Sequence, residues 1–143
     1  KGIIMDRRTF LGAAALATLL PMTAKAAGKP LDYAPGLVKK RLDAGETVFL
    51  DFKADWCSTC RAQERAIEAL KNADPAYDAA ITFINVDWDQ YKGDALTKSL
   101  KIPRRSTLVV LKGEEELGRI VAGTGKDEIK ALMDVALAAA ASS

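Results

Sequence analysis

The two cysteines of the 143-residue chain, Cys57 and Cys60, lie at a junction that limits the folds open to it. The run TVFLDF just before them (residues 47–52) is apolar and rich in strand formers, which is typical of a strand buried on both faces. Over residues 58–74, apolar and charged residues instead recur at the helical period. The apolar face of this expected amphipathic helix comprises Ala62, Ala66, Ile67 and Leu70. The chain therefore passes from a buried strand into a surface helix at its cysteines.

Helix and strand patterns alternate along the chain from Leu31, and their total length suits one domain with its own core. We expect helices within residues 33–45, 94–101 and 126–140, a buried strand at 80–88, a hairpin of two strands at 106–123 and a short first strand at 30–33. Alternation followed by an antiparallel hairpin predicts an α/β fold. Its central mixed sheet has about four or five strands, with helices on both faces.

Residues 1–26 have the three-part form of an export signal. A basic start ends at Arg8, an apolar stretch follows at residues 10–22, and small residues at 24–26 provide a cleavage site. A buried amphipathic helix is the alternative. It is disfavoured because the apolar stretch has no helical stripe and contains Pro21.

The motif DRRTFLG (residues 6–12) resembles a twin-arginine export signal, with the Sec route as the alternative. We interpret the four residues before Met5 as a remnant that precedes this signal. The mature domain, residues 27–143, is then expected to start near Ala27 and to act in the periplasm of a Gram-negative bacterium. We expect no stable membrane insertion once the signal is removed.

Charge and composition exclude several classes of function. The formal net charge of +2 reflects the first 26 residues, which hold four of the 21 basic residues and one of the 19 acidic residues. The remainder therefore holds 17 basic and 18 acidic residues, which does not suggest the concentrated basic face that binds nucleic acid. The chain has no histidine, so histidine-dependent catalysis and histidine metal ligands are excluded.

Three functions compete for the cysteine pair. A closed zinc site needs four ligands, which two cysteines can supply only if two chains share the metal. A structural disulfide that closes so short a loop removes little entropy from the unfolded chain. A redox pair has a mechanism, because unpaired N–H groups at the start of the helix favour the Cys57 thiolate. Cys60, one turn further on, can then attack the mixed disulfide that Cys57 forms with a substrate. We expect Cys57 to be the exposed thiol and Cys60 to lie behind it.

The segment DFKADWCSTC (residues 51–60) resembles the active-site segment of thioredoxins, with Trp56 directly before the first cysteine. The similarity extends through INVD (84–87) and the expected hairpin, and covers about residues 31–136. LDFKADWC is especially similar to the C-terminal thioredoxin-like domain of DsbD-type periplasmic thiol:disulfide reductases. The resemblance implies a thioredoxin fold and a monomeric thiol–disulfide oxidoreductase. Its partners would be protein disulfides or dithiols and an upstream electron donor or acceptor.

Asp51 matches the buried acid that thioredoxins carry below their cysteines. A carboxylate in an apolar run is costly in free energy unless it has a function or partners. The resemblance implies a desolvated acid with a raised pKa, which accepts the proton of Cys60 as Cys60 attacks. The alternative is that Asp51 faces solvent at an edge of the sheet. We expect Asp55 to be an exposed neighbour; the alternative is that its charge opposes thiolate formation at Cys57.

The chain departs from the family pattern at two positions. Thioredoxins carry a cis-proline that faces the cysteines, and an alignment without gaps puts Ser106 there, with Thr107 beginning the next strand. Pro103 could take that place only if three residues were inserted. Phe83 stands where many thioredoxins have a lysine near the buried acid.

The loop before Thr107 is expected to keep the family geometry. We expect Ser106 to lie within a few ångströms of Cys57 and the peptide bond between Arg105 and Ser106 to be cis. Such a bond before a non-proline residue costs about 2.5–4 kcal/mol, so a functional constraint would have to hold it. Arg104 and Arg105 are either charge-selective contacts of a substrate groove or ordinary solvated cations of a loop.

We therefore predict a periplasmic thiol–disulfide oxidoreductase that reduces protein disulfides. Cys57 is the nucleophile, Cys60 the resolving thiol and Asp51 the proton acceptor. The expected substrate-groove residues are Trp56, Arg105, Ser106 and Thr107. The alternatives are a periplasmic disulfide oxidase and a non-enzymatic module that binds a metal or a partner through its thiolates. Because the cysteines carry the electrons, no organic cofactor and no metal is expected.

Overall fold

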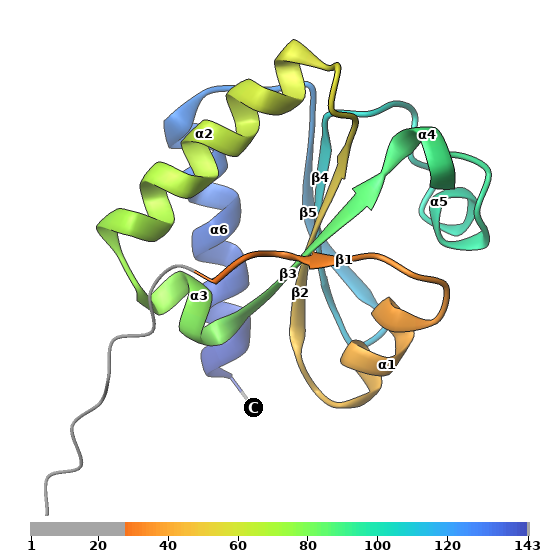
Figure 1. Cartoon of the computed structure of the whole chain (residues 1–143). Coiled ribbons are helices and arrows are strands. Elements are labelled where there is room, and N and C mark those ends of the chain that lie inside the picture. The colour runs from red at the N-terminus through yellow and green to blue at the C-terminus, as the bar shows by residue number, and fades with distance from the viewer. Residues whose placement is uncertain (1–27, 143) are drawn as a thin grey trace, which may run out of the picture.

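The structure is a computed structural model that describes residues 28–142 (Figure 1). The expected export signal therefore lies outside the described residues. Within residues 28–142, no helix combines the length and the apolar character needed to cross a membrane.

The described residues form one mixed sheet in the order β1-β3-β2-β4-β5. Its strands are β1 (Leu31–Asp32), β2 (Thr47–Lys53), β3 (Ile81–Asp87), β4 (Thr107–Lys112) and β5 (Glu115–Val121). The first three run parallel to one another, while β4 is antiparallel to both β2 and β5. This is the predicted mixed α/β sheet with its C-terminal hairpin.

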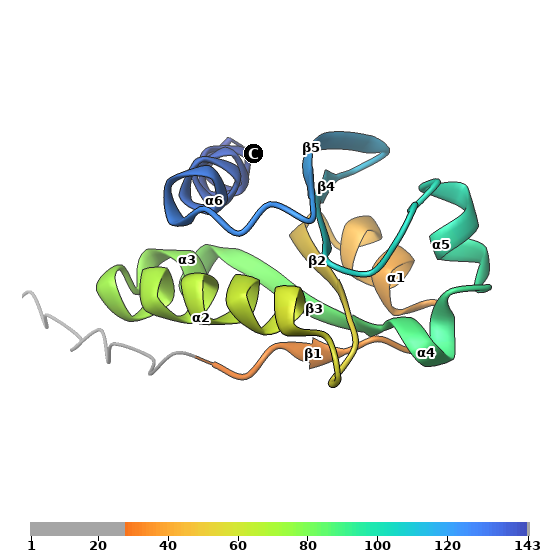
Figure 2. The same ribbon diagram turned by 90° about the horizontal axis from the view of Figure 1, so that it is seen from above.

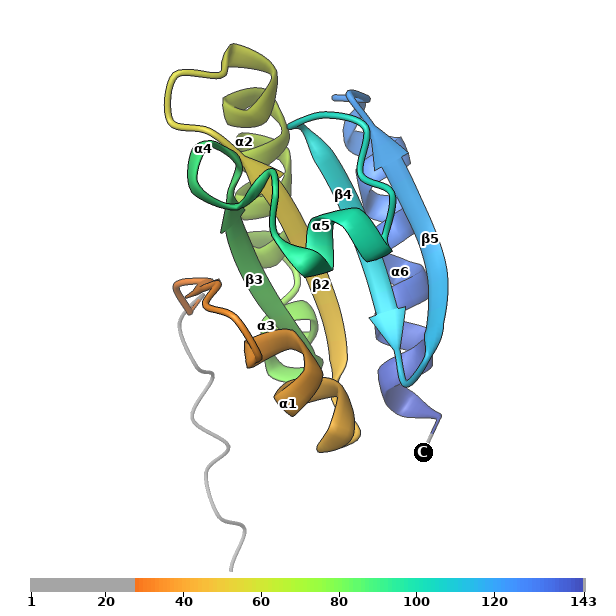
Figure 3. The ribbon, with the colours of Figure 1, turned by 90° about the vertical axis from the view of Figure 1, so that its right-hand side faces the viewer.

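Helices cover both faces of the sheet, as Figures 2 and 3 show. The helices are α1 (Leu37–Asp43), α2 (Ser58–Ala73), α3 (Ala76–Ala80), α4 (Trp88–Tyr91), α5 (Ala95–Ser99) and α6 (Lys126–Ala141). The long helices α2 and α6 lie with α3 on one face, and α1, α4 and α5 lie on the other (Figure 2). The expected layer arrangement is confirmed.

Alternation along β2 divides the core into two layers. Phe49 belongs to the apolar cluster under α2 and α6, whereas Leu50 and Phe52 belong to the cluster under α1. Successive side chains of a strand point to opposite faces, so Asp51 shares the α2–α6 side with Phe49. β2 lies between β3 and β4 and is buried from Thr47 to Phe52, as its apolar run predicts.

Two short helices were not expected from the sequence. Pro75 precedes α3, and the side chain of Asp87 caps α4 by accepting a hydrogen bond from the backbone N–H of Asp89. With five and four residues, α3 and α4 are too short for a helical period to be recognised. Both connect elements that the sequence did predict.

Candidate active site

Cys57 forms the junction between β2 and α2. Its backbone is extended, with φ −90° and ψ 113°, and its sulfur accepts a hydrogen bond from the backbone N–H of Cys60 over 3.2 Å. A cysteine sulfur thus takes the N-cap role that Ser, Thr, Asp and Asn usually fill. This contact holds the sulfur against the unpaired N–H groups and positive end of α2, which favour a thiolate.

Both cysteines are free and both are buried, with Cys57 3% and Cys60 0% exposed. The expectation that Cys57 is an exposed thiol is therefore wrong, because almost none of its surface is accessible to solvent. Ala54 and Trp88 pack against the pair and cover it. Cys57 is nevertheless the more accessible of the two sulfur-bearing residues, which is the order that its assigned role requires.

The two thiols differ in acidity. Burial raises the pKa of Cys57, but hydrogen bonds from the Cys60 thiol, the Ser106 hydroxyl, the Cys60 backbone and the Arg105 side chain outweigh burial and lower it to about 7. Burial raises the pKa of Cys60, and the hydrogen bond to Cys57 raises it further. Cys57 is therefore the thiol that ionises first as the pH rises through neutrality, while Cys60 keeps its proton.

Ser106 faces the cysteines, as the alignment without gaps predicts. Its hydroxyl oxygen lies 3.2 Å from the Cys57 sulfur and 3.1 Å from the Cys60 sulfur. Pro103 is exposed. The expected proximity of Ser106 to Cys57 is confirmed.

The expectation of a cis peptide before Ser106 is wrong. Every peptide bond within the described residues is trans, and Ser106 instead adopts a left-handed backbone conformation with φ 63°. A positive φ is uncommon for a residue with a side chain, but it costs less than a cis bond before a non-proline residue. The loop therefore meets the cysteines through an unusual φ rather than an unusual peptide bond.

Asp51 is buried at the centre of the sheet, at 5% exposure. In the strand register it lies opposite Asn85 on one side and Leu108 on the other, so the alternative of a solvated edge position is wrong. Burial raises the pKa of Asp51 to about 7, although the positive charge of Lys53 opposes this. Its Oδ1 atom has no hydrogen-bond partner among the described residues. Asp51 therefore titrates near neutral pH, as a proton acceptor must.

A cavity of about 270 Å³ opens beside Asp51, between α2 and the sheet. Phe49, Phe83, Glu64 and Lys71 are among the side chains that line it. Its lining is part apolar and part charged, and it offers space next to the carboxyl group.

The side chain of Lys71 places a positive charge over the ring of Phe83. Its ammonium nitrogen lies 3.7 Å from the centre of the Phe83 ring and 3.0 Å from a carboxylate oxygen of Asp78. The side chain is only 4% exposed. The lysine that the family pattern places on β3 is absent, but α2 supplies a buried lysine over the phenylalanine that replaces it.

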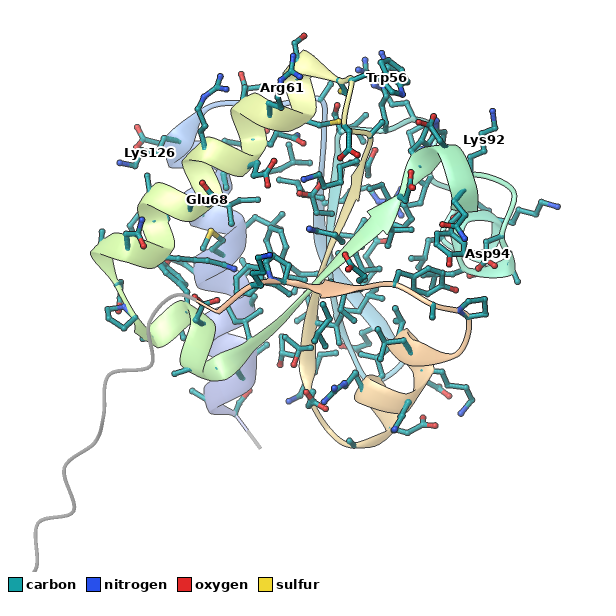
Figure 4. All side chains as sticks on the ribbon, viewed as in Figure 1. Trp56, Arg61, Glu68, Lys92, Asp94 and Lys126 are labelled. Atoms are coloured by element: carbon teal, nitrogen blue, oxygen red, sulfur yellow. The ribbon has the colours of Figure 1, made fainter. Side chains whose placement is uncertain are left out.

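The rim of the site is aromatic and cationic. Trp56 is 57% exposed and donates a hydrogen bond from Nε1 to Asp89 over 2.8 Å. The guanidinium group of Arg105 lies 4.4 Å from the centre of the Trp56 ring. The Nε atom of Arg105 is buried and has no hydrogen-bond partner among the described residues. Figure 4 shows Trp56 and Arg61 at the same end of the molecule, where α2 begins.

Arg104 and Thr107 support this rim from within. The Arg104 side chain donates to the carbonyl of Arg105 over 3.0 Å, and the Thr107 hydroxyl donates to the carbonyl of Arg104 over 2.7 Å. Thr107 is fully buried in β4, so the expectation that it lines a substrate groove is wrong. Asp55 is exposed, as expected.

Gln63 belongs to the site but was missed by the sequence analysis. Its Nε2 donates to the carbonyl of Ser106 over 3.0 Å and to that of Gly123 over 2.9 Å. The side chain is fully buried, whereas Ala62 is only partly buried. The buried face of α2 is therefore rotated slightly from the expected one. The four-residue spacing from Gln63 to Ile67, which places both on one helix face, is the signal that could have revealed this.

These features define a class of protein. A dithiol at the N-terminus of a helix, above a buried carboxyl in the central strand, is the site of a thiol–disulfide oxidoreductase. The chain belongs to the thioredoxin family, whose model, described as Thioredoxin, matches residues 37–135.

Known proteins resemble the chain in both sequence and structure. A thioredoxin H-type protein of Fagopyrum esculentum is 33% identical over 91 residues, which cover 64% of this chain and 72% of that protein. One from Brassica campestris is 30% identical over 120 residues, covering 82% and 90%. The matched segments span between 55% and 90% of the length of such curated relatives. The crystal structure of Trxlp from Edwardsiella tarda superimposes with a TM-score of 0.62 at 27% identity, covering 74% of this chain and 96% of that one.

The described residues do not supply a set of metal ligands. Among residues 28–142, no cluster of three or more His, Cys, Asp and Glu side chains could hold a metal ion. The alternative of a thiolate metal site would therefore need ligands from elsewhere.

Proposed function

We propose that this protein is an exported thiol–disulfide oxidoreductase that reduces protein disulfides in the periplasm. The observation that carries the proposal is the sulfur of Cys57, which caps α2 and receives hydrogen bonds within a covered dithiol. An upstream donor of electrons restores the dithiol after each turnover, and the enzyme acts as a monomer.

The reaction begins at Cys57. Its thiolate attacks one sulfur of a substrate disulfide, so that a mixed disulfide forms and the other substrate sulfur leaves as a thiolate. Cys60 then attacks Cys57, the Cys57–Cys60 disulfide forms, and the second substrate sulfur leaves. Asp51 accepts the proton that Cys60 loses, because its carboxyl titrates near neutral pH.

The direction of electron flow follows from how strongly the thiolate is stabilised. Strong oxidases hold their nucleophilic cysteine at a pKa far below neutral, near 3.5 for the protein DsbA, whereas thioredoxin has a value of about 7. The pKa of about 7 for Cys57 supports a reductase. The similarity of LDFKADWC to DsbD-type reductases supports the same direction.

Redox titration against glutathione tests the direction. We expect a reduction potential near that of thioredoxin, about −270 mV, rather than near the −120 mV or so of a strong oxidase. The measurement follows the thiol content of residues 27–143 by alkylation and mass spectrometry. A potential near the oxidase value would replace the proposed reductase with the oxidase.

Export is tested on the protein made in its own cell. The basic start, the apolar stretch and the small residues at 24–26 lead us to expect a mature N-terminus near Ala27 in the periplasmic fraction. Intact mass spectrometry of the native protein measures this directly. A native chain that retains Arg7 and Arg8 and fractionates with the cytoplasm would contradict the proposal.

Arg105 is proposed to select substrates with an acidic residue next to the reactive cysteine. Its guanidinium group lies at the rim against the ring of Trp56, so its positive charge can pair with an incoming carboxylate. Replacement of Arg105 by Gln should slow reduction of a peptide disulfide flanked by Glu about fivefold to tenfold. The same peptide flanked by Gln should be affected far less.

The matched control is Arg65→Gln, which removes the same charge from the exposed surface of α2. It should affect both peptides equally and slightly. If Arg105→Gln slowed both peptides equally, Arg105 would act only through the pKa of Cys57, which its side chain lowers, and would have no part in selection.

A further inference from the structure

The hydroxyl of Ser106 occupies a position between the two reacting sulfurs. It lies 3.2 Å from that of Cys57 and 3.1 Å from that of Cys60, and the residue is fully buried. A serine hydroxyl carries a single hydrogen, so it can donate to only one sulfur at a time. A proline at this position would have no hydrogen to donate.

The backbone of Ser106 is fixed on both sides. Its N–H donates to the carbonyl of Phe52 over 2.7 Å, and its carbonyl accepts from the N–H of Ala122 over 2.8 Å. The side chain of Gln63 donates to the same carbonyl over 3.0 Å. These contacts hold the residue at φ 63° and leave rotation of the hydroxyl as its main freedom.

The sulfurs need a hydrogen-bond donor at different moments. Before reaction, the negative charge is on Cys57, which also receives the backbone N–H of Cys60. Once the Cys57 sulfur is bonded to the substrate in the mixed disulfide, the negative charge of the attacking thiolate must form on Cys60. Among residues 28–142, Ser106 is the side chain within hydrogen-bond distance of both sulfurs, so its hydroxyl can follow the charge without movement of its backbone.

We propose that Ser106 is a catalytic residue whose hydroxyl donates first to the Cys57 thiolate and then, after rotation, to the thiolate that forms on Cys60. This inference rests on the thiol–disulfide exchange proposed above. It assigns to Ser106 a chemical role in both steps, beyond a place in the substrate groove.

The second step balances as follows. The proton of Cys60 passes to the Asp51 carboxylate, and Ser106 donates its hydrogen bond to the resulting sulfur anion. The anion attacks Cys57, the Cys57–Cys60 bond forms, and the bond to the substrate sulfur breaks with its electron pair. The substrate leaves as a thiolate, and Ser106 keeps its hydrogen throughout.

Two substitutions separate the hydroxyl from the backbone. Ser106→Ala and Ser106→Gly both remove the hydroxyl, but only glycine adopts a positive φ without strain. Thr97→Val is the control for loss of a buried hydroxyl elsewhere, because the Thr97 hydroxyl donates to the carbonyl of Tyr91 in the α4–α5 region. Thermal unfolding of each variant reports whether the fold is retained.

The readouts are the pH profile of Cys57 alkylation and the lifetime of the mixed disulfide in single-turnover experiments. We expect both Ser106 variants to move the midpoint of the profile upward by about one pH unit. The mixed disulfide should persist about tenfold longer, because a hydrogen bond to a charged sulfur is lost. Thr97→Val should leave the pH midpoint unchanged.

The inference is overturned if neither variant moves the midpoint or the lifetime, or if alanine moves them and glycine does not. The second result would assign the effect to backbone strain. The wild-type protein is measured in parallel, so that the inference and the proposed function can fail separately. If the wild type carries out thiol–disulfide exchange and the Ser106 variants behave like it, only the role of Ser106 is disproved. If the wild type itself carries out no exchange, the proposed function is disproved.

Discussion

Replacement of Cys60 by serine is expected to stop the enzyme at the mixed disulfide. Cys57 keeps its cap on α2 and its contact with Ser106, so the first exchange still occurs. The serine oxygen cannot form the disulfide that releases the substrate. Multiple turnover should therefore fall on the order of a thousandfold or more, while a covalent adduct accumulates.

Intact mass spectrometry measures this result as a mass increase equal to the bound half of the substrate, which a reductant removes. The matched variant is Cys57→Ser, which leaves Cys60 as the only thiol. Cys60 is fully buried and its pKa is raised, so that variant should form little adduct. Rapid adduct formation by Cys57→Ser, with none by Cys60→Ser, would reverse the two assigned roles.

The long elements of the fold could be predicted from the sequence because each has a clear hydrophobic pattern. β2 is apolar on both faces because it lies at the centre of the sheet, and α2 is amphipathic because it covers one face. The short helices α3 and α4 depend on local caps such as Asp87, which leave no period to recognise. The short strand expected at residues 30–33 is present as β1 and pairs with β3.

The reactive centre was predictable for a different reason. Cys57, Cys60 and Asp51 are close in sequence, so one strand and one helix turn bring them together. Gln63 and Lys71 were missed, because polar residues on the buried face of α2 do not follow the apolar pattern.

Ser106 shows where sequence reasoning ends at this site. The register of β4 predicted its place beside Cys57, but its backbone conformation depends on hydrogen bonds to Phe52 and Ala122. Phe52 lies on β2 and Ala122 directly follows β5, so the residues next to Ser106 carry no sign of them. A positive φ in place of a cis bond is therefore a property of the assembled sheet.

Replacement of Asp51 by asparagine is expected to stabilise the protein, and more strongly as the pH rises. Burial raises the pKa of Asp51 from 3.8 to about 7, so between these values the folded state binds more protons than the unfolded state. The wild type therefore loses stability as pH rises from about 4 to about 7, by about 4 kcal/mol in total. Asparagine does not titrate and avoids this loss.

Urea unfolding of wild type and Asp51→Asn at about pH 5 and about pH 8 measures the effect. The advantage of the variant should grow by roughly 3 kcal/mol between these conditions. Cys57 titrates in the same range with the opposite sign, because its pKa is lowered in the fold. The informative quantity is therefore the change with pH in the difference between the unfolding free energies of Asp51→Asn and wild type. Asp55→Asn, at an exposed position, is the control.

The same substitution should slow catalysis while it stabilises the fold. Without the carboxylate, Cys60 has lost its proton acceptor, and resolution of the mixed disulfide should slow on the order of a hundredfold. Formation of the mixed disulfide by Cys57 should change much less, so the two steps separate in single-turnover experiments. A variant with unchanged resolution but increased stability would show Asp51 to be a buried acid outside the proton transfer. Unchanged stability at both pH values would instead mean that its carboxyl is not desolvated in solution.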